Sequence, residues 1–190
     1  GIANQFTIRW GALLLYTGSL WLLYLTGKRL FNPDVAKLTL IIASIIPVFG
    51  IVFGIFTLPD APLIFFWSAS FYCAVCEFFN YADTPPHPYR PTYRLAILGI
   101  LVGLTCLSKY HGFFIGLGFV IFCLTIPQYR AVFRSSWLWL GLGLFIITLF
   151  PLWYWNLQHD WVSFGFHLSK RFQTPKSFNI LGVLGVLLGN

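Results

Sequence analysis

Long apolar runs separated by short polar connections make up most of the chain. Each run is apolar on nearly every face, whereas the strands of a membrane barrel alternate apolar and polar residues. Such runs predict α-helices that span, or nearly span, a hydrocarbon core of about 30 Å. The expected helices are Trp10–Thr26, Leu38–Phe56, Leu63–Phe79, Leu95–Leu107, Phe113–Ile126 and Trp137–Trp155, and another begins after Phe178. The pattern predicts an all-α fold, a polytopic transmembrane helical bundle of about six to seven helices.

The ends of the chain and its prolines add detail to this expectation. The chain opens with Gly1, contains no Met and stops at Asn190 inside the last run. Residues 1–190 are therefore expected to be part of a single transmembrane domain that is truncated at both ends. Pro47 should kink the second expected helix and Pro151 the sixth, because proline lacks a backbone donor.

Composition decides the class of protein. Hydrophobic residues are 58% of the chain and charged residues only 9%, whereas about one quarter of a soluble domain is charged. The apolar excess must face lipid. The net charge of +7 does not indicate nucleic-acid binding, because the basic residues lie in short clusters between apolar runs. The four cysteines lie inside these runs and indicate neither a disulfide nor a metal site.

Basic residues gather in alternate connections. The first, third and fifth connections contain Lys28, Arg29, Lys37, Arg90, Arg94, Arg130 and Arg134. The second has none, the fourth has only Lys109, and the last has three. Because Lys and Arg favour cytoplasmic loops, we expect the odd-numbered connections to be cytoplasmic. The residues that then share the outer face are Asp60, Lys109, His111, His159, Asp160 and His167.

Two charged residues stand out at this expected outer face. A carboxylate at the mouth of a membrane bundle is costly to desolvate, so Asp60 needs a partner or a function; it also fits a helix N-cap followed by Pro62. Lys109 either extends to the interface or presents a cation to an anionic substrate, above all a phosphate. His111 could donate a hydrogen bond to the same group. Glu77, near the opposite end of its run, is expected to meet a loop arginine or lipid headgroups.

The last connection mixes tryptophans and phenylalanines with His159 and Asp160. One interpretation is an aromatic belt followed by a short amphipathic helix. The other is contact with a sugar or a lipid phosphate, because aromatic faces and polar side chains together suit a pyranose ring. The spacing of His111, His159 and Asp160 does not support a metal site. The sequence contains no P-loop, zinc-protease or serine-hydrolase motif.

Four segments carry a family resemblance: IRWGALLLYTGSLWLLYLTGKRLF, FTLPDAPLIFFW, LVGLTCLSKYHGFFIGLGFVIFCL and FPLWYWNLQHDWVSFGFHL. In order and spacing they resemble the bacterial dolichyl-phosphate-mannose protein mannosyltransferase-like glycosyltransferases of the GT-C superfamily, which include aminoarabinose transferases. The resemblance implies transfer of a sugar from a polyprenyl phosphate to an acceptor on the outer face of the membrane, with inversion. It also implies a catalytic carboxylate in a large first outer loop, a segment that is not in this chain, and leaves room for a divalent metal.

The resemblance assigns roles to three residues. Asp60 matches the aspartate of a PDAPL-type loop that faces the active-site cavity, Lys109 matches the lysine of an L[ST]K turn, and Arg9 matches a basic residue before a conserved helix. The chain reads LSKYHG where the family often reads LTKGP, which leaves the substrate open.

We therefore expect the membrane core of a glycosyltransferase in a bacterial inner membrane, with its site facing outward. Asp60 is the candidate catalytic residue within the chain. The candidate substrate-binding residues are Lys109, His111, Asn156, His159, Asp160 and Arg9. The expected partners are the bilayer, the polyprenyl-phosphate sugar donor and an unidentified lipid, protein or glycan acceptor. The alternatives are a transporter or flippase of a lipid-linked anion and a noncatalytic membrane subunit.

Overall fold

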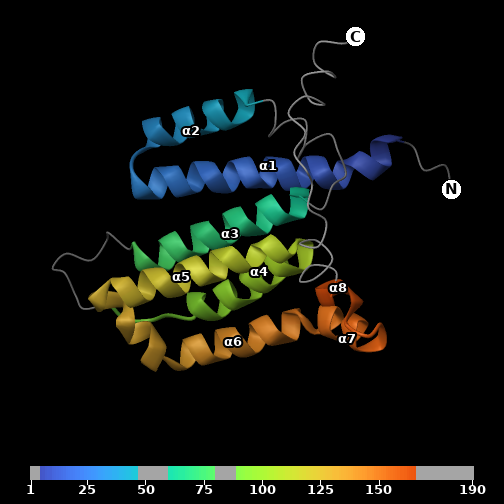
Figure 1. The fold of residues 1–190 in the computed structure, drawn as a ribbon. Helices are drawn as coiled ribbons and strands as arrows, with labels where there is room; N and C mark the ends of the chain where they lie inside the picture. The colour runs from blue at the N-terminus through green and yellow to red at the C-terminus, as the bar shows by residue number, and fades with distance from the viewer. Residues whose placement is uncertain (1–4, 47–59, 80–88, 166–190) are drawn as a thin grey trace, which may run out of the picture. The chain divides into compact units, whose positions relative to one another are not determined.

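The structure, a computed structural model, describes residues 5–46, 60–79 and 89–165 (Figure 1). The chain divides into two compact units, Gly1–Phe150 and Pro151–Asn190. Over the described ranges every regular element is helical, which confirms the all-α prediction. The first unit contains α1 (Gln5–Leu30), α2 (Pro33–Ile45), α3 (Asp60–Phe78), α4 (Arg94–Ser108), η2 (Tyr110–Gly112), α5 (Phe113–Thr125), η3 (Pro127–Arg134) and α6 (Ser136–Thr148). They are followed by α7 (Phe150–Gln158) and α8 (Val162–Gly165).

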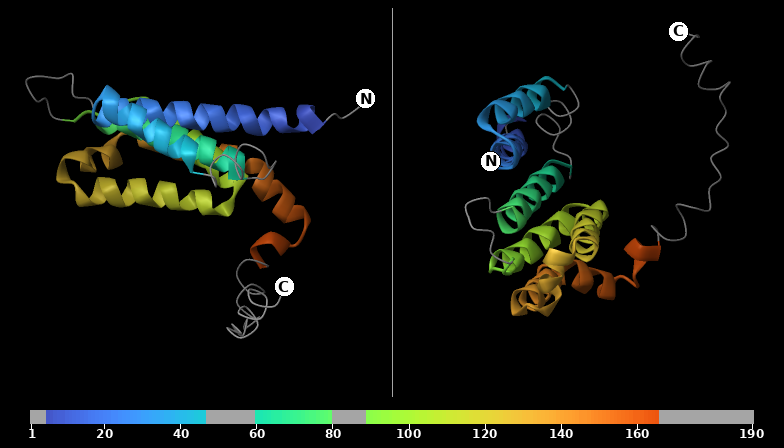
Figure 2. Two further views of the ribbon diagram at one scale, coloured as in Figure 1. Left: turned by 90° about the horizontal axis from the view of Figure 1, so that it is seen from above. Right: turned by 90° about the vertical axis from the view of Figure 1, so that its left-hand side faces the viewer.

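The helices of the first unit lie side by side in a layered bundle. α1 packs on α2 and α3, α3 packs on α4, and α4 packs on α6 (Figures 1 and 2). α5 lies beside α4, to which η2 joins it. Successive helices run in opposite directions, so alternate connections meet at the same end of the bundle.

Each expected helix before Phe178 has an observed counterpart, but three differ in extent. The first is longer, Gln5–Leu30 instead of Trp10–Thr26. The second begins earlier, at Pro33, because the Asn32 side chain caps the helix. This side chain accepts hydrogen bonds from the backbone N–H groups of Asp34 and Val35. The sixth is divided close to the kink that Pro151 predicts: α6 ends at Thr148 and α7 starts at Phe150. Pro151 is the second residue of α7, where its missing N–H removes no helical hydrogen bond. Pro47 and the run after Phe178 lie outside the described residues.

The outer surface of the bundle is apolar. Large hydrophobic side chains are exposed on each of the helices α1 to α6, whereas a soluble protein seldom exposes a continuous apolar surface. Among the helices that the structure describes, α3 alone is long and apolar enough to cross a membrane. The number rises to three if two interrupted pairs, Tyr110–Thr125 with Pro127–Arg134 and Ser136–Thr148 with Phe150–Gln158, each count as one span. α4 is apolar but shorter.

The contact between α4 and α6 depends on two glycines. A Cβ placed on Gly99 would lie 2.1 Å from the carbonyl oxygen of Gly141. A Cβ on Gly141 would lie 2.6 Å from the carbonyl oxygen of Leu95. Both obstacles are backbone atoms, so the two helices touch main chain to main chain, as membrane helices do where small residues face each other.

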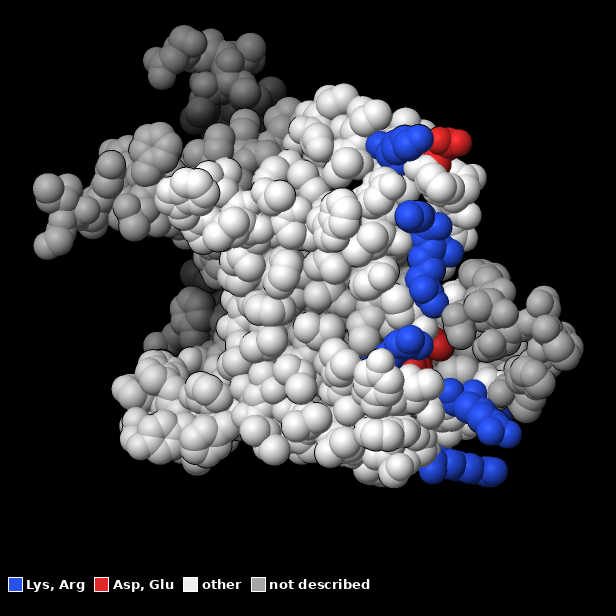
Figure 3. All heavy atoms as spheres, turned by 180° about the vertical axis from the view of Figure 1, so that it is seen from behind, with Lys and Arg blue, Asp and Glu red and all other residues white. Residues whose placement is uncertain are grey.

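Basic side chains gather at one end of the first unit (Figure 3). We call this the basic end; it comprises the connections after α1, α3 and α5 with the adjoining helix termini. Its described Lys and Arg residues are Lys28, Arg29, Lys37, Arg90, Arg94, Arg130 and Arg134. The grouping agrees with the alternation in the sequence, because every odd-numbered connection returns to this end.

A buried carboxylate organises the basic end. Glu77 is only 4% exposed. Its Oε1 accepts hydrogen bonds from the Tyr89 hydroxyl at 2.7 Å and the Thr92 N–H at 2.8 Å, and its Oε2 accepts one from the Thr92 hydroxyl. Burial, together with the hydrogen bond to Glu77, raises the pKa of Tyr89 above its usual range. Glu77 was expected to meet a loop arginine or lipid headgroups; the structure gives it Tyr89 and Thr92 as partners, and Arg94 donates to the Cys76 carbonyl.

Replacing Glu77 should therefore destabilise the bundle. In Glu77→Ala, the Tyr89 hydroxyl and the Thr92 N–H lose their acceptor, and each buried donor left unpaired costs about 1–3 kcal/mol. We expect the free energy of unfolding in detergent to fall by about 3 kcal/mol, whereas Glu77→Gln, which keeps one acceptor oxygen, should lose less. Equal stability of the alanine variant and the wild type would show that this network does not stabilise the connection between α3 and α4.

Candidate functional site

An ion pair lies at the end of the first unit opposite the basic end. The Nζ of Lys109 is 2.6 Å from Oδ1 of Asp60. Asp60 is the first residue of α3 and Lys109 directly follows the last residue of α4. The two side chains are 49 positions apart in sequence. The structure therefore brings together the acid and the cation that the alternation of the connections predicts on one face.

The pair remains accessible from outside. The Lys109 side chain is 40% exposed and that of Asp60 is 23% exposed. An ammonium group carries three N–H donors, and Asp60 takes only one of them. The arrangement thus presents a cation, held in place by a carboxylate, to any anion that approaches this end.

A tight turn positions Lys109. Its N–H donates to the Thr105 carbonyl at 3.2 Å, and its own carbonyl accepts from the Gly112 N–H at 2.9 Å. A Cβ on Gly112 would lie 2.4 Å from the carbonyl carbon of Thr105, so only glycine allows η2 to fold against the last turn of α4. Gly112 is not among the residues predicted for the site, although its place at the end of LSKYHG was the available signal.

The other candidate residues of this region differ in position. His111 lies in η2, exposed, with its ring centroid 6.4 Å from that of Phe114. Arg9 lies near the start of α1, at a position where the structure describes the backbone and not the side chain. Their expected contacts with a substrate stay predictions.

The second unit holds the remaining candidates. Asn156 is fully buried, and its side-chain amide donates to the Leu152 carbonyl at 2.9 Å. Its backbone carbonyl accepts from the N–H groups of His159 and Trp161, which closes the turn after α7. In this conformation Asn156 supports the turn, and its expected substrate contact stays a prediction.

The same turn displays a polar and aromatic surface. His159 is exposed and stacks on Trp155 with ring centroids 4.3 Å apart. Asp160, also exposed, has a φ of 47°, and Trp161 has a φ of 56°. This left-handed conformation is tolerated by aspartate and uncommon for a bulky residue. His167 lies outside the described residues.

Within residues 5–46, 60–79 and 89–165, no group of three or more His, Cys, Asp or Glu side chains could hold a metal ion. The ion-pair end itself supplies a fixed cation and its carboxylate partner.

The comparison with known proteins agrees with a membrane helical bundle. No curated protein and no solved structure matches the chain. The dolichyl-phosphate-mannose-protein mannosyltransferase family matches residues 2–155, a range that includes Asp60 and Lys109. This match covers most of the chain and confirms the resemblance. The chain belongs to the dolichyl-phosphate-mannose-protein mannosyltransferase family, whose members are membrane glycosyltransferases of the GT-C type.

Proposed function

We propose that the full-length protein transfers a sugar from a polyprenyl-phosphate donor to an acceptor hydroxyl at the outer face of the membrane. The observation that carries this proposal is the Asp60–Lys109 ion pair, at 2.6 Å, at the end of the bundle opposite the basic end. Lys and Arg favour the cytoplasmic side, so the ion-pair end would face outward. The partly exposed Lys109 at that end is then a natural contact for a lipid phosphate.

The charge changes during transfer explain why a lysine would be needed. The bond between the sugar's anomeric carbon and the phosphate oxygen breaks, and polyprenyl phosphate leaves with an additional negative charge. Lys109 would stabilise this charge more in the transition state than in the ground state. The anomeric carbon then bonds to the acceptor oxygen, and the acceptor's proton passes to a base.

Asp60 serves best as a positioning residue in this reaction. Its carboxylate is occupied by Lys109, so it neutralises the cation between turnovers and fixes its place. Without such a partner, a lysine at a membrane interface extends toward the headgroups. A second carboxylate, in the outer loop that the family resemblance implies, would take the proton from the acceptor.

The distribution of charge favours an enzyme over a transporter. In the described part of the first unit, every Asp, Glu, Lys and Arg whose side chain is described lies in a connection or near a helix end. A transporter would be expected to place charged or broken-helix residues near the middle of the membrane.

The proposal is tested by reconstituting the full-length protein in liposomes with a polyprenyl-phosphate-linked sugar. We expect the release of polyprenyl phosphate to depend on the protein and on added membrane acceptor. Movement of the intact donor across the bilayer without cleavage would establish the transporter instead. A donor that is neither cleaved nor moved across the bilayer would contradict both functions.

Replacing Asp60 should weaken transfer less than removing the lysine. In Asp60→Asn the side chain keeps its size but no longer holds the ammonium group by charge, so we expect kcat/KM for the donor to fall about tenfold. Asp34→Asn is the matched control, because Asp34 pairs with Lys37 at 3.1 Å at the basic end. If Asp60→Asn transferred sugar at the wild-type rate while Asp60→Glu did not, the positioning role would be wrong.

A further inference from the structure

The basic end carries more positive charge than its own acidic residues balance. Of the acidic residues described there, Asp34 pairs with Lys37 at 3.1 Å, and Glu77 is buried with Tyr89 and Thr92. The cations of the third and fifth connections are left without an acidic partner in the described ranges. Figure 3 shows how closely the Lys and Arg side chains gather there.

The element η3 lies across this end as an amphipathic segment. It turns by 116° from the helix that precedes it. Tyr129 and Val132 are buried, and the Tyr129 hydroxyl donates to the Phe78 carbonyl at 2.8 Å. Arg130 and Arg134 are exposed. A short segment with apolar residues inward and arginines outward is typical of one that lies in the plane of a membrane interface.

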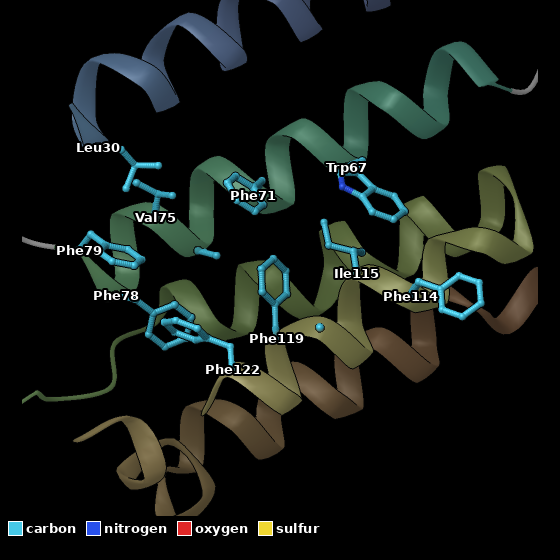
Figure 4. A pocket seen from close by; sticks show the side chains of 12 residues that line it. Leu30, Trp67, Phe71, Val75, Phe78, Phe79, Phe114, Ile115, Phe119 and Phe122 are labelled. Atoms are coloured by element: carbon cyan, nitrogen blue, oxygen red, sulfur yellow. The ribbon is translucent and has the colours of Figure 1, made fainter. Parts of the chain in front are cut away.

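An apolar groove starts beside η3 and runs between α3 and α5 (Figure 4). It has a volume of about 420 Å³, within the range of ligand pockets. Its wall at the basic end includes Leu30, Phe79 and Phe122. The Phe122 ring stacks on Tyr129 of η3 with centroids 5.1 Å apart. The stacked rings of Phe122 and Tyr129 therefore connect the groove to η3, the element that carries the two arginines.

We propose that the basic end binds an anionic phospholipid of the surrounding leaflet, with its phosphate at Arg130 and Arg134 and one acyl chain in the groove between α3 and α5. Both parts of such a molecule find a complement: a guanidinium group suits a phosphate, and an aromatic-lined groove suits a hydrocarbon chain. Anionic lipids are enriched in the cytoplasmic leaflet, which is also where the positive-inside rule puts this end. The site is distinct from the Asp60–Lys109 pair, which lies at the other end.

The two halves of the proposal can be tested separately on the full-length protein. Native mass spectrometry would measure bound phosphatidylglycerol against phosphatidylcholine. Replacing both arginines with glutamine should lower the affinity for phosphatidylglycerol about 30-fold, the effect of two basic residues at an anionic surface. Gly118→Leu should also lower it, because Gly118 lines the groove and a Cβ there meets nothing within 4 Å, so the leucine fills the groove without a clash.

Two controls separate binding from loss of folding. Lys37→Gln removes one charge at the same end, where the cation is already paired with Asp34. Gly143→Leu adds the same side chain to α6 at a position that is also open. We expect both controls to bind phosphatidylglycerol as the wild type does, and all variants to keep their melting temperature.

Several outcomes would overturn the proposal. Equal binding of the two phospholipids would remove the role of charge. Loss of binding only in the arginine variant would indicate a headgroup surface without a site for a chain. Displacement of phosphatidylglycerol by an uncharged polyprenol would assign the groove to an isoprenoid chain. None of these results depends on sugar transfer, so the proposed function stands or falls separately.

Discussion

Lys109→Ala in the full-length protein should lower the rate of sugar transfer by about 10²- to 10³-fold, the usual cost of removing one group that stabilises developing charge in a transition state. The loss should appear in kcat, because the charge on the phosphate develops as the glycosidic bond breaks. Lys109→Arg keeps the positive charge but changes its geometry and should retain part of the activity. The measurement is the release of polyprenyl phosphate from a sugar donor in proteoliposomes.

The matched control for this prediction is Lys37→Ala. Lys37 also pairs with an aspartate, Asp34, but at the basic end and with both side chains largely exposed. Exposed pairs contribute little to stability, so this variant should fold and transfer sugar normally. If Lys109→Ala kept near-normal turnover, or lost the folded protein as well as the activity, Lys109 could not be assigned to the phosphate.

Gly141→Ala should strongly destabilise the fold. The added methyl group would lie 2.6 Å from the Leu95 carbonyl oxygen, and backbone atoms of a helix cannot turn aside as a side chain can. α4 and α6 must separate, which removes packing along their whole contact. We expect the free energy of unfolding to fall by about 3 kcal/mol, at the upper end for overpacked interiors, as measured by thermal unfolding in detergent.

Gly143→Ala provides the comparison on the same helix. A Cβ at Gly143 meets nothing within 4 Å, and alanine is a better helix former than glycine. This variant should be as stable as the wild type or slightly more stable. If the two variants unfolded at the same temperature, the close approach of α4 and α6 would not contribute to the fold.

The sequence predicted the helices well because their signal is local. A run such as Leu63–Phe79 is apolar on nearly every face, and only a helix satisfies its backbone within one segment in lipid. The ends were less predictable. The break at Leu149 and the early start of α2 at Pro33 depend on caps and turns of a few atoms, which a count of apolar residues does not register.

The candidate site was predicted in part. The alternation of basic connections placed Asp60 and Lys109 on one face, and the structure pairs them. The sequence did not show that the two side chains touch. It also did not show that Gly112 shapes the turn between α4 and α5, which positions Lys109. It also predicted that Glu77 meets a loop arginine or lipid headgroups, and it did not show that Tyr89 and Thr92 donate hydrogen bonds to this carboxylate.

By itself, then, the sequence determined that this protein is helical, that it lies in a membrane, and which connections share an end. These properties follow from composition and order along the chain, because lipid imposes the same requirement on every segment separately. Only the tertiary structure decided which side chains meet: Asp60 with Lys109, Gly99 with Gly141, Glu77 with Tyr89. Such pairs depend on which helices become neighbours and at what depth they pack, and that is fixed by the summed contacts of segments far apart in the chain.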